Sequence, residues 1–247
     1  MEKKRLTDRQ SEMLDLINDH SFLTVAKLAE LTYTSESSVR RDLAKLEGLY
    51  CIRRTHGGAC ALDDVNRPAR LDDRMNKNTL AKRVIAKKAA TMLSDGQSIM
   101  LDSSTTAGFL IPHIAKLHDV TVFTNNMITA VNAVNFSINT HCLGGHSIGG
   151  NAVLSGEETY AAISRLRPDI LFFSSQSIDR DGVITDPTPE ENYARRLMLE
   201  CAKKRVFLCD SEKFGSRSLY VLTSADSLDA CIFDSPPKDL RTRCDVR

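Results

Sequence analysis

Short polar stretches follow several apolar runs in the C-terminal two-thirds of the sequence, and their chemistry suits an anion. Residues 101–106 read Leu-Asp-Ser-Ser-Thr-Thr between an apolar run and a helical segment. Hydroxyl groups and unpaired backbone N–H groups at a helix start attract an anion, because the helix dipole is positive there. A plain N-capping loop explains these residues equally well. Three more polar stretches, Thr124-Asn125-Asn126, Gly144-Gly145 and Ser174-Ser175, follow other runs, and Lys213 after a fifth run could supply a cation.

A second set of polar residues, near the N-terminus, could contact DNA. In the helix predicted after Ser35, Val39, Leu43 and Leu46 recur at helical spacing and predict an apolar face. The other faces of this helix carry Ser37, Ser38, Arg40, Arg41 and Lys45. Arginine can donate two hydrogen bonds to guanine, and serine can bind bases or phosphates, so such a helix could read a major groove. The next stretch adds Arg53, Arg54 and His56 on a predicted hairpin that would contact the DNA backbone or minor groove.

The charge of this N-terminal region does not by itself favour DNA. Residues 1–58 contain ten Lys/Arg and nine Asp/Glu, a net charge of +1, so a solvated helix with an arginine pair is the simpler interpretation on charge alone. The order of elements favours DNA binding instead. Thr7-x-x-Gln10 is a capping box, Thr24 and Ser35 are N-caps of two more helices, and Gly57-Gly58 is a hairpin signal. Residues 1–60 therefore read as three short helices followed by a small hairpin.

The rest of the chain reads as a linker and an α/β domain. Residues 61–78 lack a long apolar stripe and are predicted to be a linker. Residues 80–93 are predicted to be a helix with Val84, Ile85, Ala89 and Met92 on one inward face. Strand-like runs are then predicted at 98–101, 120–123, 138–143, 169–173, 205–209 and 230–233, with helical segments at 107–117, 127–135, 157–166 and 188–203. Such alternation is typical of βαβ units and a mostly parallel sheet, here over residues 79–247. Ligands bind such sheets at the carboxyl ends of the strands, so the polar stretches can converge.

The N-terminal motifs resemble the winged helix-turn-helix of the DeoR family of bacterial transcription regulators. The resemblance rests on Ser35, on Arg40-Arg41-Asp42-Leu43 in the third helix and on Arg54-Thr55-His56-Gly57-Gly58-Ala59 in the hairpin. One departure is Tyr33, where the family's turn usually has glycine. The resemblance implies that the third helix is the recognition helix and that the hairpin is the wing.

Residues 75–235 resemble the sensor domain of the same family, which is similar to ribose-5-phosphate isomerase and typically binds a phosphorylated sugar. The residues that match its pattern lie at 101–106, 124–125, 144–145, 156, 191 and 210–215. The resemblance implies effector contacts from Asp102, Ser103, Ser104, Thr105, Thr106, Asn125, Gly144, Gly145, Gly156, Ser175, Glu191 and Lys213. Three departures bear on the effector: Ser104 replaces a glycine, Ser174 and Ser175 stand where glycine is common, and Glu212 replaces a serine.

Together these observations predict a fold and a function. The fold is an α+β winged helix-turn-helix domain followed by an α/β, Rossmann-like sensor domain with a mostly parallel sheet. The function that the resemblance implies is that of a DNA-binding repressor of carbohydrate-metabolism genes, released by a phosphorylated sugar, with an activator as the alternative sign of regulation. One short recognition helix has a small footprint, so the partners expected are double-stranded operator DNA, the sugar phosphate and further copies of the chain in a dimer or tetramer. No cofactor is predicted.

Two enzyme classes are alternatives. Gly145-His146-Ser147-Ile148-Gly149 matches the G-x-S-x-G nucleophile elbow of hydrolases, but no helix is predicted directly after Ser147 and all six histidines precede it. A sugar-phosphate isomerase is the stronger alternative, with Asp102 and Glu191 as candidate bases by position. An isomerase does not need a winged helix, so binding without turnover is preferred.

Composition sets the remaining expectations. The chain has 247 residues and a net charge of +1, without a predicted secretory signal, lipid anchor or membrane-spanning run. Seven scattered cysteines without a C-x-x-C motif favour a reducing cytoplasm over a disulfide framework. His141, Cys142 and His146 come closest to metal-ligand spacing, and no metal site is predicted from them.

Overall fold

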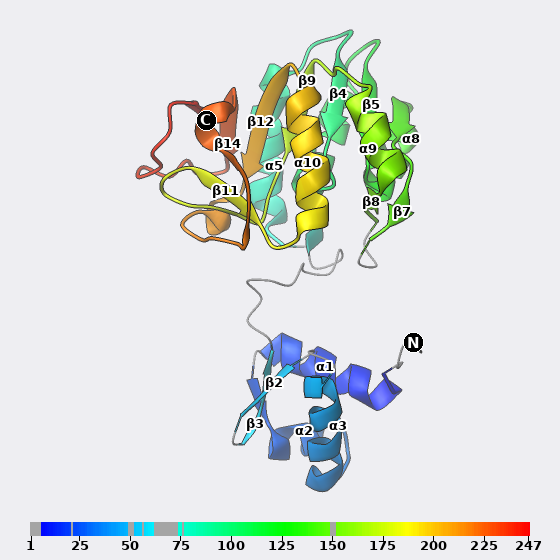
Figure 1. The fold of residues 1–247 in the computed structure, drawn as a ribbon, viewed down its shortest axis with the longest axis vertical. Helices are drawn as coiled ribbons and strands as arrows, with labels where there is room; N and C mark the ends of the chain where they lie inside the picture. Colours follow the sequence, from blue (N-terminus) through cyan, green and yellow to red (C-terminus); the bar gives the residue numbers. More distant parts are fainter. Residues whose placement is uncertain are drawn as a thin grey trace. The chain divides into compact units, whose positions relative to one another are not determined.

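The computed structural model divides the chain into two compact units, Met1–Asp64 and Val65–Arg247 (Figure 1). It describes residues 6–20, 22–48, 52–55, 57–61, 74–75, 77–148 and 152–247. Most of the predicted linker, residues 61–78, lies outside this described part of the chain. The domain boundaries at residues 60 and 78 therefore stay predictions.

The N-terminal unit has three helices and a three-stranded antiparallel sheet. Its elements are α1 (Asp8–His20), β1 (Phe22–Thr24), α2 (Val25–Leu31), α3 (Glu36–Gly48), β2 (Ile52–Thr55) and β3 (Gly58–Ala61). The predicted capping box is confirmed, because Thr7 N donates to Gln10 Oε1 over 3.1 Å and Gln10 N donates to Thr7 Oγ1 over 3.3 Å. The predicted hairpin is also confirmed, with Thr55 opposite Gly58, and β1 pairs with its second strand in the order β1-β3-β2.

One core holds these N-terminal elements together. Met13, Ile17 and Leu28 contribute from α1 and α2, and all three side chains are fully buried. Val39, Leu43 and Leu46 are equally buried, so the predicted apolar face of the third helix is confirmed. Burial of one such side chain stabilises a fold by about 1.5–3 kcal/mol. The core thereby fixes which face α3 turns outward.

The C-terminal unit is built on a seven-stranded parallel sheet. Its strands are β4 (Ser98–Leu101), β5 (Thr121–Thr124), β6 (Asn139–Cys142), β9 (Ile170–Phe173), β12 (Lys204–Cys209), β14 (Ala230–Phe233) and β15 (Asp245–Val246). All six predicted runs are confirmed as strands of this sheet. The spatial order is β15-β14-β12-β9-β4-β5-β6. The chain builds outward from β4 through β5 to β6, returns to β9 on the other side of β4, and continues outward, so β4 and β9 flank the switch point.

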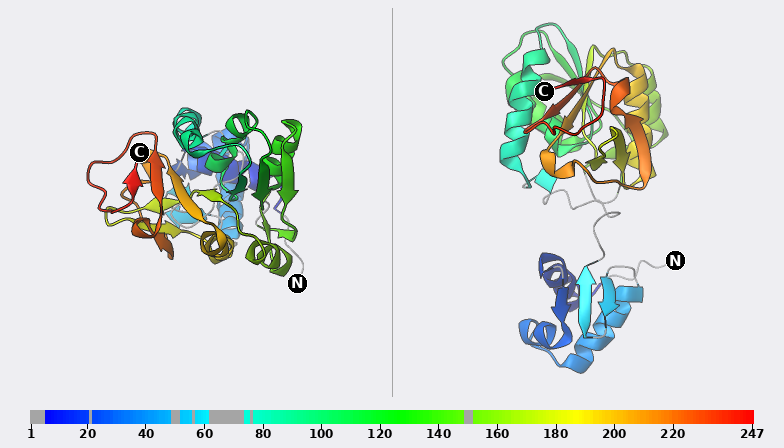
Figure 2. Two further views of the ribbon diagram at one scale, coloured as in Figure 1. Left: turned by 90° about the horizontal axis from the view of Figure 1, so that it is seen from above. Right: turned by 90° about the vertical axis from the view of Figure 1, so that its left-hand side faces the viewer.

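Helices cover both faces of this sheet (Figure 2). One face packs against α5 (Thr79–Ala89), α6 (Thr105–Gly108), α7 (Ile111–Ile114) and α8 (Met127–Asn135). The other face packs against α9 (Glu157–Ser164) and α10 (Pro189–Cys201). Successive side chains of a strand point to opposite faces of the sheet: Ile99 and Leu101 belong to one buried cluster and Met100 belongs to the other. This strict alternation explains why the strands read as continuous apolar runs.

Some predicted elements need correction. The segment predicted as one helix at 107–117 is broken into the two short helices α6 and α7, with Pro112 in the first turn of α7. Val84, expected inward, is 44% exposed, whereas Lys82 on the same helix is only 3% exposed. A hairpin of β7 (His146–Ser147) and β8 (Leu154–Ser155) and an antiparallel sheet of β10 (Ser177–Ile178), β11 (Val183–Asp186) and β13 (Tyr220–Ser224) were not predicted.

Candidate DNA-binding surface and effector site

Helix α3 is positioned by its cap and by a buried carboxylate. Ser35 Oγ accepts from Ser38 N over 3.3 Å, which confirms Ser35 as a cap. Asp42 is 3% exposed; it accepts hydrogen bonds from Arg9 Nε at 2.8 Å and from Gln10 Nε2 at 2.9 Å. Burial alone would raise the pKa of Asp42, but the bonds from Gln10 and Arg9 outweigh it and lower the pKa. The family-matched aspartate therefore joins α3 to α1 rather than facing DNA.

The predicted recognition residues lie on the outer side of α3. Ser37, Arg40, Arg41 and Lys45 are exposed and Ser38 is half-buried. Arg40 pairs with Glu36 at 2.6 Å, and Arg41 donates to Ser38 Oγ at 3.3 Å. Both guanidinium groups are thus held along the helix, and an exposed ion pair such as that of Arg40 with Glu36 contributes little stability.

The hairpin residues are described only in part. Arg54 lies 3.8 Å from Glu47 Oε2 and its backbone N donates to Glu47 Oε1 over 3.3 Å, which joins the hairpin to the end of α3. His56 and the side chain of Arg53 lie outside the described residues. Tyr33, the departure in the turn, has a φ of 50° and is 97% exposed. The turn therefore keeps the left-handed backbone that favours glycine, at some conformational cost.

The carboxyl ends of β4 and β9 meet at the switch point of the sheet, where two predicted polar stretches lie side by side. Asp102 follows β4 and Ser174 follows β9, and Ser174 N donates to Asp102 Oδ2 over 3.4 Å. Ser104 has a φ of −75° and caps α6 by accepting from Ala107 N at 3.2 Å. A side chain is therefore compatible with this backbone although the family pattern has glycine here. The Ser104 hydroxyl also donates to Asp102.

A buried arginine joins three carboxylates behind this loop. Arg195 of α10, 4% exposed, donates to Asp102 Oδ2 at 2.7 Å, Asp186 Oδ2 at 2.9 Å and Glu191 Oε2 at 3.0 Å. It also donates to Ser103 Oγ at 3.3 Å. Burial would lower the pKa of Arg195, but the three carboxylates raise it, so the guanidinium stays charged. Burial raises the pKa of Asp186.

Three cations lie in front of the same loop. Lys213 Nζ donates to Ser174 Oγ at 3.1 Å and lies 3.5 Å from Asp210 Oδ2. Arg74 donates to Ser103 O at 3.5 Å and lies 3.8 Å from Glu191 Oε1. Lys82 is buried and donates to the carbonyl oxygen of Arg74. We call Arg74, Lys82 and Lys213 the cationic group.

The electrostatics of the cationic group favour an incoming anion. The pKa of Lys82 is lowered to about 8, first by burial and then by the positive charge of Lys213, with Asp210 opposing. A lysine held among like charges gains most when an anion arrives. Glu212, the third departure from the family pattern, faces away from the cationic group: it is exposed and pairs with Lys77 at 3.5 Å. Its negative charge therefore faces solvent rather than the cationic group.

The other predicted effector residues form a neighbouring set around β7 and β8. Asn125 Nδ2 donates to Leu154 O at 3.0 Å, while its Oδ1 is buried and has no hydrogen-bond partner among the described residues. Gly145 and Gly156 have φ values of 118° and 112°, and a Cβ on Gly145 would come within 2.5 Å of Ser155 O. Thr159 donates to Gly144 O. Gly145 and Gly156 therefore shape the backbone, and Asn125 offers an acceptor that no described residue uses.

The two sets are joined through one amide. Asn126 Nδ2 donates to Ser103 O at 3.1 Å, so the end of β5 is tied to the loop after β4. Thr105 and Thr106 begin α6, and Thr105 Oγ1 donates to the carbonyl oxygen of Arg74 at 3.2 Å. Ser175 is buried and donates to Ser177 O at 3.1 Å. The structure thus brings most predicted effector residues to one end of the sheet, with Ser175 satisfied locally.

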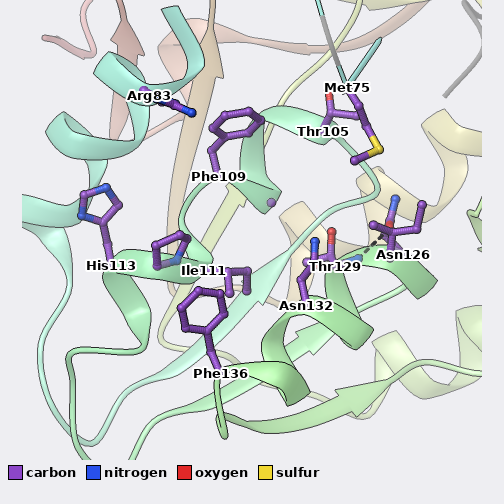
Figure 3. Close-up of a pocket in the computed structure, with 13 residues that line it drawn as sticks. Met75, Arg83, Thr105, Phe109, Ile111, His113, Asn126, Thr129, Asn132 and Phe136 are labelled. Atoms are coloured by element: carbon purple, nitrogen blue, oxygen red, sulfur yellow. Dashed lines mark hydrogen bonds between the residues drawn. The ribbon is translucent and has the colours of Figure 1, made fainter. Parts of the chain in front are cut away.

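A cavity of about 580 Å³ adjoins the loop on the α5–α8 side (Figure 3). Phe109, Ile111 and Phe136 line it, and Thr105 and Asn126 lie at its polar side. Thr105 is the predicted effector residue that the cavity reaches. Its aromatic and aliphatic lining suits an apolar group, whereas the cationic group suits a phosphate.

The sequence missed three residues of the site: Arg74, Lys82 and Arg195. Arg74 falls in the predicted linker, and Lys82 falls in the predicted helix 80–93 but was not singled out as a candidate. The sequence does contain one indication of Arg195. It follows Glu191 by four positions and lies on the same helix face as Met198, which is buried. A charged residue at a position that should be apolar predicts a buried ion pair.

The hydrolase alternative is not supported. Ser147 lies in the short strand β7 and is exposed, rather than at a sharp turn from a strand into a helix. Within the described residues, no group of three or more His, Cys, Asp or Glu side chains could hold a metal ion. Among the same residues, no helix is long and apolar enough to cross a membrane.

Both units of the chain match known protein families in sequence. The DeoR-like helix-turn-helix domain matches residues 9–65, and the DeoR C terminal sensor domain matches residues 77–235. The HTH-type transcriptional regulator FruR of Bacillus subtilis is 30% identical over 94% of this chain and 92% of its own. The L-fucose operon activator of Haemophilus influenzae is 30% identical over 96% of both chains, and other relatives are named repressors.

Among solved structures, the fold of this chain has distant similarity to ribose 5-phosphate isomerases. The ribose 5-phosphate isomerase of Plasmodium falciparum has a TM-score of 0.40 at 18% identity, over 54% of this chain and 52% of its own, too little to carry an argument. The sequence relatives are transcriptional regulators, so the isomerase alternative is set aside. The chain belongs to the DeoR family of DNA-binding transcriptional regulators, with an N-terminal helix-turn-helix domain and a C-terminal sensor domain.

Proposed function

We propose that this regulator represses carbohydrate-metabolism genes and releases its operator when a phosphorylated sugar binds at the switch point of the sheet. The cationic group at the ends of β4 and β9 is the observation that supports the sugar phosphate. The names of several relatives support repression. Open α/β sheets bind ligands at their switch point, because the loops there diverge and leave room.

The phosphate would lie between the cationic group and the hydroxyl loop. Lys213 and Lys82 supply positive charge, and Ser103 and Thr105 supply hydroxyl groups. Arg74 would exchange its 3.8 Å pairing with Glu191 for the phosphate, since a guanidinium binds phosphate through two hydrogen bonds. Asp102 is fully buried and bonded to Arg195, so it positions the loop instead of touching the ligand. The free Oδ1 of Asn125 would accept a sugar hydroxyl.

Release of the operator follows as a population shift. A ligand moves an equilibrium only by its difference in affinity for the two states. The sugar phosphate would therefore bind better to the arrangement that does not bind DNA. Two copies of the recognition helix are needed for a long operator, so we also propose a homodimer or tetramer with half-sites about one helical turn apart, or a multiple of it.

A thermal-shift screen tests the proposed ligand class. We expect one sugar phosphate to raise the unfolding temperature of the full chain, because a ligand that binds only the folded state stabilises it. The matched controls are the same sugar without its phosphate and inorganic phosphate alone. Equal shifts from the sugar and its phosphate would contradict the proposed site.

Binding of this sugar phosphate should weaken as the pH rises through about 8. Lys82 has its pKa lowered to about 8, so it is charged below this pH and neutral above it, where it no longer attracts the phosphate. The phosphate group itself stays dianionic over this range, because its second pKa is about 6. Calorimetric titration one unit below and one unit above pH 8 measures the effect. Lys82→Arg keeps its charge and should abolish the pH dependence; a wild type with flat affinity would place the phosphate elsewhere.

Arg41 is predicted to reach the operator. Arg41→Ala should weaken specific binding by about 1–3 kcal/mol if the guanidinium contacts a base, and Arg40→Ala should do the same. If either arginine contacts only a phosphate, its loss should lower the affinity for all DNA sequences alike. The slope of log affinity against log salt concentration should then become shallower by about one. Binding of operator and of random DNA by the full chain distinguishes these cases. Exposed Lys87 lies in the other unit, so Lys87→Ala is the charge-matched control. Wild-type binding by both arginine variants would remove α3 from the interface.

A further inference from the structure

Two thiols face each other at the edge of the C-terminal sheet, away from the effector residues. Cys231 lies in β14 and is fully buried, and Cys244 comes directly before β15 and is half-buried. Their sulfur atoms are 3.2 Å apart. β14 and β15 run parallel with Cys231 opposite Val246, so Cys244 lies at the start of the strand that neighbours the strand of Cys231.

The backbone around this pair is fixed on both sides. Arg247 N donates to Cys231 O at 3.0 Å, and Phe233 N donates to Arg247 O at 2.9 Å. Before the strand, Thr242 Oγ1 and Arg243 N both donate to Asp226 Oδ1, at 2.9 and 2.7 Å. A disulfide has an S–S bond of about 2.05 Å, so the sulfur atoms need to approach by only about 1 Å. Side-chain rotation can supply that movement without breaking these bonds.

The two thiols have different acidities, which suits an attacking and a resolving role. The hydrogen bond with Cys231 lowers the pKa of Cys244 to about 7, against the effect of burial. The hydrogen bond with Cys244 and burial both raise the pKa of Cys231. Burial also raises the pKa of Cys142, Cys201 and Cys209. Among the cysteine side chains that the structure describes, Cys244 alone therefore combines partial exposure with a thiolate near neutral pH.

We propose that Cys231 and Cys244 form a reversible redox site, oxidised to a disulfide by hydroperoxides and reduced again by dithiols. The Cys244 thiolate attacks the O–O bond of ROOH; the sulfur becomes a sulfenic acid, and RO⁻ leaves and takes a proton to give ROH. The Cys231 sulfur then attacks the sulfenic sulfur. Hydroxide leaves with the Cys231 proton as water, so two thiols and ROOH give one disulfide, ROH and water. A dithiol returns both electrons by thiol–disulfide exchange.

The disulfide would attach the C-terminal strand β15 covalently to the sheet. β15 covers β14, which otherwise would present the edge of the sheet, and the bond closes residues 231–244 into a loop. Closing a loop removes disorder from the unfolded chain, so we expect the oxidised protein to unfold at a higher temperature. We also expect oxidation to slow proteolysis of the C-terminal residues.

Mass spectrometry of the full-length reduced protein tests the proposal. Hydrogen peroxide should lower the intact mass by about 2 Da, peptide mapping should find a Cys231–Cys244 link, and dithiothreitol should reverse both. The oxidation rate should rise with pH through about 7, as the Cys244 thiolate forms.

Variants separate this pair from other cysteines. Cys244→Ser and Cys231→Ser should each lose the cross-link, whereas Cys209→Ser, also at a buried position of this sheet, should keep it. The wild-type peptide map does not depend on any variant folding. A link between other cysteines, retention of the mass loss in Cys244→Ser, or oxygen added without a cross-link would each overturn the proposal.

Discussion

Arg195→Ala is expected to cost the C-terminal unit about 3–5 kcal/mol, the penalty typical of breaking a buried ion pair from one side. The physical reason is that Asp102, Asp186 and Glu191 all bond to this one guanidinium, and within the described part of the chain only Glu191 has a second cation, Arg74, at 3.8 Å. Without Arg195, buried carboxylates must take up protons or draw in water. We expect either response to disorder the loop after β4.

Hydrogen exchange of the full chain measures this prediction. Amides of β4, β9 and β12 report on the C-terminal unit, and amides of α3 serve as an internal reference that should not change. Arg196→Ala is the matched control, because Arg196 neighbours Arg195 on α10 but is exposed. Asp186→Asn should cost less, since it removes one of three negative charges and its pKa is already raised. A loss in Arg195→Ala no greater than in Arg196→Ala would show that the carboxylates do not depend on this guanidinium.

Local signals explain why so much of the fold could be predicted. The Thr7–Gln10 box, the Ser35 cap and the apolar spacing of Val39, Leu43 and Leu46 each act within one helical turn or two. The parallel strands can also be predicted from the sequence, because strands buried on both faces of a sheet form continuous apolar runs. The short strands β10 and β11 escaped prediction because Ser177 and Thr185, which bond through their hydroxyl groups at 2.8 Å, are polar yet buried.

The site was only partly predictable, because its charges are satisfied across long stretches of chain. Asp102 and Arg195 are 93 positions apart, and no local pattern around Asp102 indicates that an arginine neutralises it. The same holds for Lys82, whose charge interacts with those of Lys213 and Asp210, which lie far along the chain. The loops of the site were found from their small polar residues. The ionic contacts that hold these loops could not be predicted from the sequence, because the fold brings their partners together from distant parts of the chain.

Lys213→Ala is expected to lower the affinity for the sugar phosphate about ten- to over a hundredfold. Lys213 donates to Ser174 at the end of β9 and its side chain is 24% exposed, so its ammonium would meet the phosphate in a partly desolvated place. One charge-assisted hydrogen bond of this kind contributes about 1.5–3 kcal/mol, which converts to that range of affinity. Operator affinity without the sugar phosphate should not change, because Lys213 belongs to the sensor unit.

The measurement is operator binding titrated with the sugar phosphate that the thermal-shift screen identifies. Lys77→Ala is the matched control: Lys77 is 71% exposed and pairs with Glu212, so its removal takes the same charge from the neighbouring surface. The midpoint for operator release should move strongly in Lys213→Ala and little in Lys77→Ala, because solvent and salt screen an exposed charge. Equal shifts would mean that Lys213 acts only through the overall field of the unit. An unchanged midpoint in Lys213→Ala, with the wild type still responding, would place the phosphate away from the ends of β4 and β9.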